Sequence, residues 1–198
     1  MIEGHFGLAA GAKHWAPRAP LWALLTGTFL VDFIFIPLSI AGLEGATPLD
    51  PARPDVYGGS VFHAYYTHSL GGALLVALVA GLFAGRAWGQ RAGVAIGAIV
   101  FSHWVLDLVV HHADLPILPG NIGGLPLLGL GLWRSPAASA VVELLLTLAG
   151  AYLYYRSAMS LPTPAGSSVS IQRRRALTAS AVTAGLLLVL FVTSVLAI

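Results

Sequence analysis

The stretch RAGVAIGAIVFSHWVLDLVVHH (residues 91–112) decides the fold of this chain. It is long and apolar enough to cross the hydrocarbon core of a bilayer, which takes about 20 residues of helix. Four further segments have the same character, and they cover residues 21–43, 68–86, 136–156 and 176–198. The sequence therefore predicts an all-α fold, a polytopic membrane helix bundle with about five transmembrane helices.

The composition supports a membrane protein. Hydrophobic residues make up 57% of the 198 residues and charged residues only 9%, whereas a soluble domain carries roughly 25% charged residues. The few basic residues are scattered around apolar segments, so we expect membrane lipids as partners and no nucleic acid. Because the chain has no cysteine, disulfides and thiolate metal sites are excluded.

The positions of the basic residues orient the predicted bundle. Of the ten Lys and Arg residues, only Arg53 and Arg134 fall on one side of the spans. The other side carries Lys13, Arg18, Arg86, Arg91, Arg156, Arg173, Arg174 and Arg175. By the positive-inside rule, the N-terminus is predicted to be cytoplasmic and the C-terminus to face outward.

Three parts follow from this layout: a bundle over residues 1–160, a polar cytoplasmic linker over 161–175 and a C-terminal transmembrane helix over 176–198. The last helix has no ionisable residue, which suits packing or self-association. Pro37 predicts a kink in the first span. The small residues Gly71 and Gly72 favour close helix packing, either within the chain or in a homo-oligomer.

Titratable residues gather near one face of the predicted membrane. His103, Asp107 and His111 recur at every fourth position, so they share one stripe of a helix. Ionisable groups at this depth cost several kcal/mol and usually have partners or a function. The same layer receives further such residues from the other spans and the outer loops: Asp32, His63, His68, His112, Asp114 and Glu143.

This layer suits a divalent metal, because imidazole and carboxylate ligands are typical of zinc and also of manganese or iron. His103 and Asp107 would ligate one ion, and His111 would complete that site or begin a second one. Each residue also has a plainer interpretation. A single buried histidine is more often a packing residue, Asp32 or Glu143 could pair with a histidine, and His112 could lie at the membrane interface.

Several motifs together resemble a known family. Gly4–His5 opens the chain, Asp32 lies in LVDFIF, HAYYTHS covers residues 63–69 and SHWVLD covers 102–107. Their order and spacing over residues 1 to about 135 resemble the LexA-binding, inner-membrane-associated metal-dependent hydrolases, small multi-span bacterial proteins. The resemblance implies a bacterial inner-membrane hydrolase whose metal ligands are His5, Asp32, His63, His68, His103 and Asp107.

The sequence departs from the family pattern at two places. LVDFIF carries one carboxylate and no histidine, and Ala64 stands where the family has a basic residue. The compensating candidates are His111, Asp114 and Glu143, which we expect to act in catalysis, one of them as the general base. Under the simple topology His5 is cytoplasmic. It joins the site only if FGLAAGAKHW forms a short helix that re-enters the membrane, or if residues 1–16 pack back into the bundle.

The sequence thus predicts a metal-dependent hydrolase acting on a lipid-like or phosphoester substrate near the outer leaflet. Besides Arg53, Arg134 is the only well-placed cation for a phosphate. A metal-ion or proton transporter is an alternative, although the inner half of the spans lacks ionisable stations. A third possibility is a scaffold without catalysis, in which the metal only holds the helices together.

Overall fold

The computed structural model describes residues 2–54, 58–161 and 168–195. Within these ranges the chain is a bundle of seven α-helices with one small hairpin, which confirms the predicted all-α architecture. The helices are α1 (Ile2–Ala12), α2 (Leu21–Thr28), α3 (Leu30–Ile40), α4 (Leu70–Trp88), α5 (Gln90–Val110), α6 (Pro136–Met159) and α7 (Val169–Val195). The strands are β1 (Ala46–Pro48) and β2 (Ser60–Phe62), and single 3-10 turns are η1 (Pro119–Asn121) and η2 (Leu132–Arg134).

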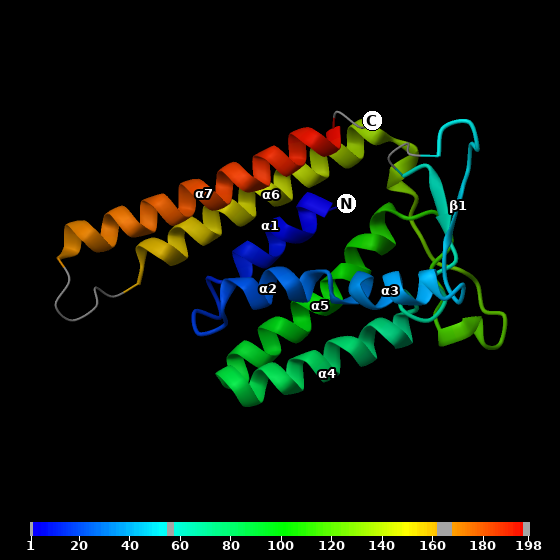
Figure 1. Cartoon of the computed structure of the whole chain (residues 1–198), viewed down its shortest axis with the longest axis horizontal. Coiled ribbons are helices and arrows are strands. Elements are labelled where there is room, and N and C mark those ends of the chain that lie inside the picture. Colours follow the sequence, from blue (N-terminus) through cyan, green and yellow to red (C-terminus); the bar gives the residue numbers. More distant parts are fainter. Residues whose placement is uncertain (1, 55–57, 162–167, 196–198) are drawn as a thin grey trace.

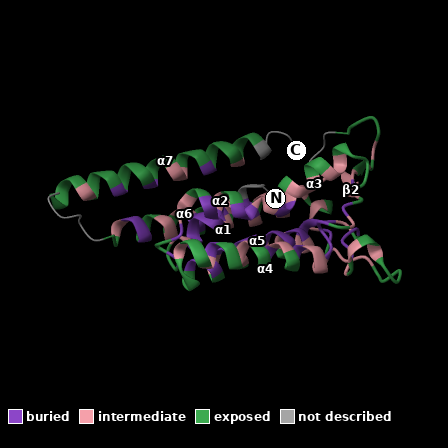
Figure 2. Cartoon of the chain, turned by 60° about the horizontal axis from the view of Figure 1, so that its bottom comes forward, coloured by how far each residue is buried: buried purple, intermediate pink, exposed green. Residues whose placement is uncertain are grey.

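Four helices in the described part of the chain, α4 to α7, are long and apolar enough to cross a membrane. The bent pair α2 and α3 together has the length of a fifth span. These five segments correspond to the five predicted from the sequence. Figure 2 shows that α7 is exposed over most of its length and that α4 exposes one face. The exposed residues of the two helices include the large apolar residues Leu78, Phe83, Leu186 and Val189. Such faces suit contact with lipid.

The first span breaks at Phe29 rather than at Pro37, where the sequence predicted a kink. The axes of α2 and α3 meet at 46°, and Phe29 leaves the helical conformation with φ −107° and ψ 10°. Its ring packs against Phe6 at 4.6 Å and against His5 at 5.7 Å between centroids. Pro37 lies inside the continuous helix α3. Contacts with α1 therefore coincide with the break, whereas the proline is accommodated.

Helices α4 and α5 form a tight antiparallel pair around glycines. A Cβ atom placed on Gly93 would lie only 2.6 Å from the carbonyl oxygen of Gly81, so the two backbones approach too closely for a side chain there. The two helices are joined at Gly89, whose φ of 91° favours glycine. By contrast, Gly71 and Gly72 lie against Pro119 and Tyr66 of the same chain. Packing within the chain therefore explains why these two residues are small.

Helix α1 lies in the middle of the bundle. Figure 1 shows it beneath the α6–α7 pair and beside α2, with the N-terminus directed toward the centre of the molecule. A Cβ atom on Gly150 of α6 would overlap the carbonyl oxygen of Gly7, and one on Gly7 would lie 2.6 Å from that of Leu146. Paired glycines thus let α1 pack directly on α6. Helix α1 therefore folds back into the bundle, which is the arrangement that brings His5 to the site.

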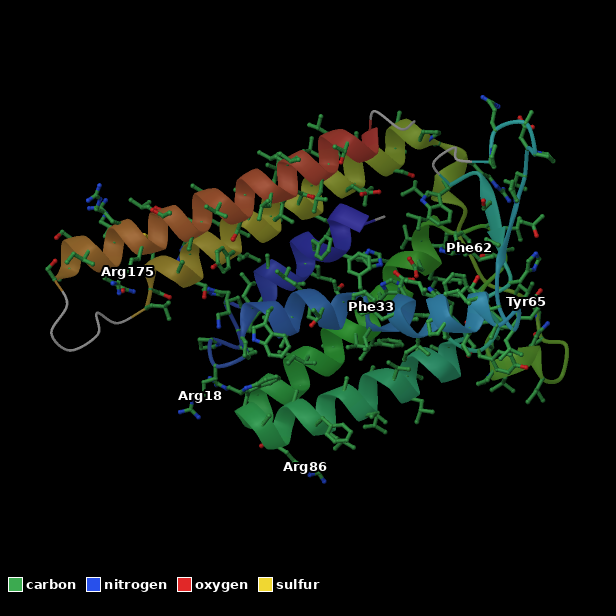
Figure 3. The ribbon with its side chains drawn as sticks, in the orientation of Figure 1. Arg18, Phe33, Phe62, Tyr65, Arg86 and Arg175 are labelled. Atoms are coloured by element: carbon green, nitrogen blue, oxygen red, sulfur yellow. The ribbon has the colours of Figure 1, made fainter. Side chains whose placement is uncertain are left out.

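The two ends of the bundle differ in charge. Figure 3 shows Arg18, Arg86 and Arg175 at one end, and Phe62 and Tyr65 at the other. We refer to these as the basic end and the hairpin end. The hairpin pairs β1 with β2 in antiparallel register, Ala46 opposite Phe62, and it was not predicted from the sequence.

Helix α7 begins earlier than expected. The Oγ atom of Ser168 accepts a hydrogen bond from the backbone N–H of Ile171 at 3.3 Å, as an N-cap residue does. The helix therefore starts at Val169, inside the stretch 161–175 predicted as a linker, and Arg173 to Arg175 belong to its first turns. Residues 162–167 of that stretch lie outside the described ranges.

Candidate metal centre

Helix α5 provides the centre of the site. Its buried face carries apolar residues toward the basic end and then His103 and Asp107 toward the hairpin end. These two side chains are four residues apart, so they lie on one face of the helix. The Nε2 atom of His103 lies 3.0 Å from Oδ2 of Asp107, and both residues are buried. An imidazole and a carboxylate are thus held side by side in the interior.

The break between α2 and α3 adds a second carboxylate. Asp32 lies in the first turn of α3, where the helix dipole favours a negative charge. Its Oδ1 atom is 3.2 Å from Nε2 of His68 and 3.5 Å from Nε2 of His103. The side chain of Asp32 is 32% exposed, whereas the side chains of these two histidines are nearly inaccessible. The site therefore opens to its surroundings at Asp32.

Thr28, the last residue of α2, forms hydrogen bonds with two histidines at the break between α2 and α3. Its backbone carbonyl accepts a hydrogen bond from Nδ1 of His103 at 2.7 Å. Its hydroxyl donates to the backbone carbonyl of His5 at 3.4 Å. A carbonyl can only accept, so the Nδ1 atom of His103 carries the proton and Nε2 faces the carboxylates.

His5 enters the site from α1. Its Nε2 atom lies 3.5 Å from Oδ1 of Asp107, and its ring lies edge-on to that of His103 at 4.3 Å between centroids. Burial lowers the pKa of the His5 imidazole, an effect that the neighbouring Asp107 carboxylate only partly opposes. The imidazole is therefore held in the neutral form, which is the form that binds metals.

His68 lies one residue before the N-cap of α4. Ser69 caps that helix by accepting a hydrogen bond from the backbone N–H of Gly72, and the indole N–H of Trp104 donates to the His68 carbonyl at 2.9 Å. The Nδ1 atom of His68 is 2.9 Å from the hydroxyl of Thr67. Its Nε2 atom points the other way, toward Asp32 and, at 3.7 Å, toward Oδ2 of Asp107.

His111 forms a separate pair with Asp114 just beyond the end of α5. Its Nδ1 atom donates to Oδ1 of Asp114 at 3.0 Å, and the other carboxylate oxygen accepts from the backbone N–H of Phe62 at 2.8 Å. The Nε2 atom of His111 faces Asp107 at 3.9 Å. The imidazole also packs on the ring of Trp133, with centroids 4.3 Å apart. All these contacts fix the orientation of the His111 ring.

Five residues thus form what we name the His/Asp cluster: His5, Asp32, His68, His103 and Asp107. The cluster contains two groups with the spacing of metal ligands, and in each group the ligand atoms lie within 4.8 Å of one another. One group is His5, His103 and Asp107, and the other is Asp32, His68 and His103. His103 belongs to both.

The donor set fits a divalent metal. Within the described residues, three buried ring nitrogens of the cluster lack a hydrogen-bond partner, namely both nitrogens of His5 and Nε2 of His103. The His103 nitrogen is close to Asp107, but the contact does not have hydrogen-bond geometry. Buried polar atoms without partners are rare and call for an explanation such as an ion. Imidazole nitrogens with carboxylate oxygens are the ligands of zinc, manganese and iron sites.

The other predicted site residues lie outside both ligand groups. His63 is exposed on the hairpin side, where its Nε2 atom contacts the Thr47 hydroxyl at 2.9 Å. Glu143 is buried on α6, and Asp114 contacts His111 rather than the cluster. Arg134, the predicted phosphate ligand, is exposed in η2.

Two residues of the site were missed from the sequence, Thr28 and Glu44. Thr28 acts through its backbone carbonyl, which no side-chain pattern reveals. Glu44 follows α3 and is 6% exposed, yet its segment GLEGATP is typical of a surface loop. The structure brings the Thr28 carbonyl to His103, and it places Glu44 against Thr67, whose hydroxyl contacts His68.

Comparison with family models, with curated proteins and with solved structures finds no match to this chain. The chemistry of the site is therefore inferred from its own geometry.

Proposed function

We propose that this chain is a membrane-embedded, metal-dependent hydrolase that acts on a lipid-like substrate. The observation that carries the proposal is the convergence of three imidazoles and two carboxylates in the His/Asp cluster, with buried ring nitrogens left without partners. Zinc is the first candidate ion, and manganese and iron are alternatives. When bound, such an ion polarises a carbonyl or phosphoryl oxygen and makes water a nucleophile near neutral pH.

His111 is the proposed general base. Its Nδ1–H is held by Asp114, which leaves Nε2 as a proton acceptor directed toward the cluster. This is the arrangement by which a carboxylate orients a catalytic histidine in other hydrolases. Asp114 is then a positioning residue, and Asp107, between His111 and the other histidines, is a ligand.

A cavity that runs along α5 as far as Ser102, the neighbour of His103 in the chain, supports a lipid-like substrate. It measures about 810 Å³ and lies between α1 and α5. Its lining includes Leu8, one helical turn from His5, and Ile99 and Ser102, which lie within one turn of His103. Most of the lining is apolar, while Arg91 and His14 lie at the basic end. An acyl chain fits such a cavity, whereas the exposed Arg134 adds no support for a phosphoester.

The apolar buried face of α5 favours an enzyme over a transporter. Between the basic end and His103, the buried residues of α5 are Ala92, Gly93, Ile96, Ile99 and Val100. A path that conducts ions or protons across a membrane needs polar side chains along its length. The site also resembles the predicted inner-membrane hydrolases in its motifs, and we place the protein in a bacterial inner membrane on that basis.

Turnover by the metal-loaded protein tests the proposal. Purified protein in detergent is loaded with zinc and given phospholipids, simple carboxylic esters and aryl phosphates. We expect hydrolysis of a long-chain ester by the unchanged protein. His111→Ala should keep its zinc and lose turnover by about 100-fold or more, whereas Asp107→Asn should lose both. His63→Ala, which changes an exposed histidine outside the cluster, is the matched control and should lose neither.

Two results would contradict the proposal. If zinc binds but no substrate is turned over, the metal only holds the helices together and the scaffold interpretation stands. If His111→Ala hydrolyses substrate at the unchanged rate, His111 is not the base.

A further inference from the structure

Glu44 is a buried carboxylate that none of the roles above uses. It lies between α3 and β1 and is almost inaccessible. Its Oε1 atom accepts hydrogen bonds from the backbone N–H groups of Tyr66 and Thr67, at 2.6 and 2.9 Å. Its Oε2 atom accepts from the Thr67 hydroxyl at 2.7 Å. The carboxylate therefore accepts three hydrogen bonds from the segment just before α4.

The hydroxyl of Thr67 links Glu44 to His68 and determines which ring nitrogen of His68 carries the proton. A hydroxyl has a single proton, and here it is directed to Glu44. The 2.9 Å contact between the Thr67 hydroxyl and Nδ1 of His68 can then form only if Nδ1 donates. The proton of the neutral imidazole is thus placed on Nδ1, and Nε2 presents a lone pair toward Asp32 and Asp107.

We propose that Glu44 is a positioning residue of the metal site, which acts through Thr67 to hold His68 in the tautomer that can ligate an ion. The proposal rests on the proposed function, since it assigns His68 as a ligand. Carboxylates that orient a metal-binding histidine usually contact the ring directly, and their loss typically lowers metal affinity by about 10- to 100-fold. Here a threonine hydroxyl stands between the carboxylate and the ring.

The other histidines have acceptors of their own. The Nδ1 atom of His103 donates to the Thr28 carbonyl, and that of His111 donates to Asp114. A change at Glu44 should therefore alter the tautomer of His68 alone. A change confined to His68 would show that Glu44 orients this one histidine, whereas a general role of Glu44 in stability would affect the whole fold.

Glu44→Gln reverses the direction of the hydrogen bonds while keeping the shape of the side chain. The amide oxygen takes over the two backbone N–H groups that Oε1 accepts. The amide NH₂ then replaces Oε2 and donates to the Thr67 hydroxyl. The Thr67 hydroxyl then donates its own proton to Nδ1 of His68. Nδ1 can accept this hydrogen bond only if it carries no proton itself. The proton of the imidazole moves to Nε2, where it blocks the lone pair that a metal needs.

Nitrogen NMR of histidine-labelled protein without metal, together with zinc titration, tests the proposal. The His68 signals are identified by their loss in His68→Asn. In the unchanged protein we expect His68 protonated at Nδ1. In Glu44→Gln we expect it protonated at Nε2, with zinc affinity about 10- to 100-fold lower. Asp50→Asn, which removes a half-buried carboxylate paired with Arg53, is the matched control and should change neither measurement.

A second variant covers the case in which Glu44→Gln does not fold. Thr67→Val leaves the backbone contacts of Glu44 in place and removes the hydroxyl, so His68 should show both tautomers. An unchanged His68 tautomer in both variants would overturn the proposal, and so would weaker zinc binding by Glu44→Gln with the tautomer unchanged. If the unchanged protein binds no zinc, the proposed function fails, and the tautomer measurement still decides the role of Glu44.

Discussion

The imidazole of His5 lies 3.5 Å from the carboxylate of Asp107, although these residues belong to the first and the fifth helix of the chain. The contact exists because α1 folds back into the bundle and packs on α6. It places a third imidazole against the central carboxylate of the His/Asp cluster. Helix α1 is thus part of the site.

The close packing of α1 on α6 predicts the effect of a single added methyl group. A Cβ atom on Gly150 would overlap the backbone of Gly7, so Gly150→Ala must push α1 away and move His5 from Asp107. We expect overpacking to destabilise the fold by about 1–3 kcal/mol. We also expect zinc affinity to fall as far as it does in His5→Ala. Thermal unfolding and zinc titration measure the two effects.

Gly185→Ala is the control for this change, because a Cβ atom on Gly185 of α7 meets nothing within 4 Å. It should leave both measurements unchanged. If Gly150→Ala binds zinc as tightly as the unchanged protein while His5→Ala does not, the packing does not hold His5 in place.

The buried His5 imidazole predicts a pH dependence of stability. Burial lowers its pKa in the folded protein, whereas in the unfolded chain the pKa is about 6.5. Below about pH 6.5 the unfolded chain therefore binds a proton that the folded protein does not, and the free energy of unfolding of the metal-free protein falls. The contribution of one such group is at most about 1.4 kcal/mol per pH unit.

His5→Leu isolates this contribution, because the other histidines remain. Thermal unfolding between about pH 5 and about pH 7.5 should show a flatter acid limb for His5→Leu than for the unchanged protein. Parallel curves for the two proteins would show that His5 takes up its proton in the fold as readily as in the unfolded chain.

The cavity between α1 and α5 predicts where an acyl chain binds. Ala98 is exposed and lines the cavity, so Ala98→Phe fills space without disturbing the core. We expect a loss of about tenfold in affinity for a phospholipid with brominated chains. Quenching of Trp15, which also lines the cavity, reports the binding once the signal of Trp15→Phe is subtracted. Val141→Phe, at an exposed position on α6 outside this lining, should have no effect. Equal quenching in both variants would place the acyl chain elsewhere.

The long helices could be predicted from the sequence because an apolar run of about 20 residues has few other stable states. The predicted span 136–156 is close to α6 (Pro136–Met159) and 91–112 to α5 (Gln90–Val110). The start of α7 was placed too late because Arg173 to Arg175 interrupt the apolar run. Charge alone does not end a helix, whereas the cap at Ser168 begins one.

The arrangement of α1 could not be predicted in the same way. Its 11 residues are too few to cross a membrane. The close packing of Gly7 on Gly150, which holds α1 inside the bundle, is seen in the structure and not in the sequence. The break at Phe29 coincides with contacts to Phe6 and His5, whereas Pro37 lies inside the continuous helix α3. Both features follow from tertiary packing that overrides local propensity.

The site residues could be predicted where they share a helix or a motif. The periodicity of α5 indicated His103 and Asp107, and the structure brings them together with Asp32, His68 and His5. His63 belongs to the same motif as His68 but lies on the exposed hairpin side. A motif specifies spacing along the chain, whereas the direction of each side chain depends on the local backbone.

The most direct test of the account is the metal content of purified protein. Elemental analysis in detergent compares the unchanged protein with His103→Ala and Asp107→Asn, and with His63→Ala as the control. We predict one or more equivalents of zinc, manganese or iron in the unchanged protein and in His63→Ala, and little in the other two variants. A metal-free unchanged protein that also fails to bind added zinc, manganese or iron would contradict it.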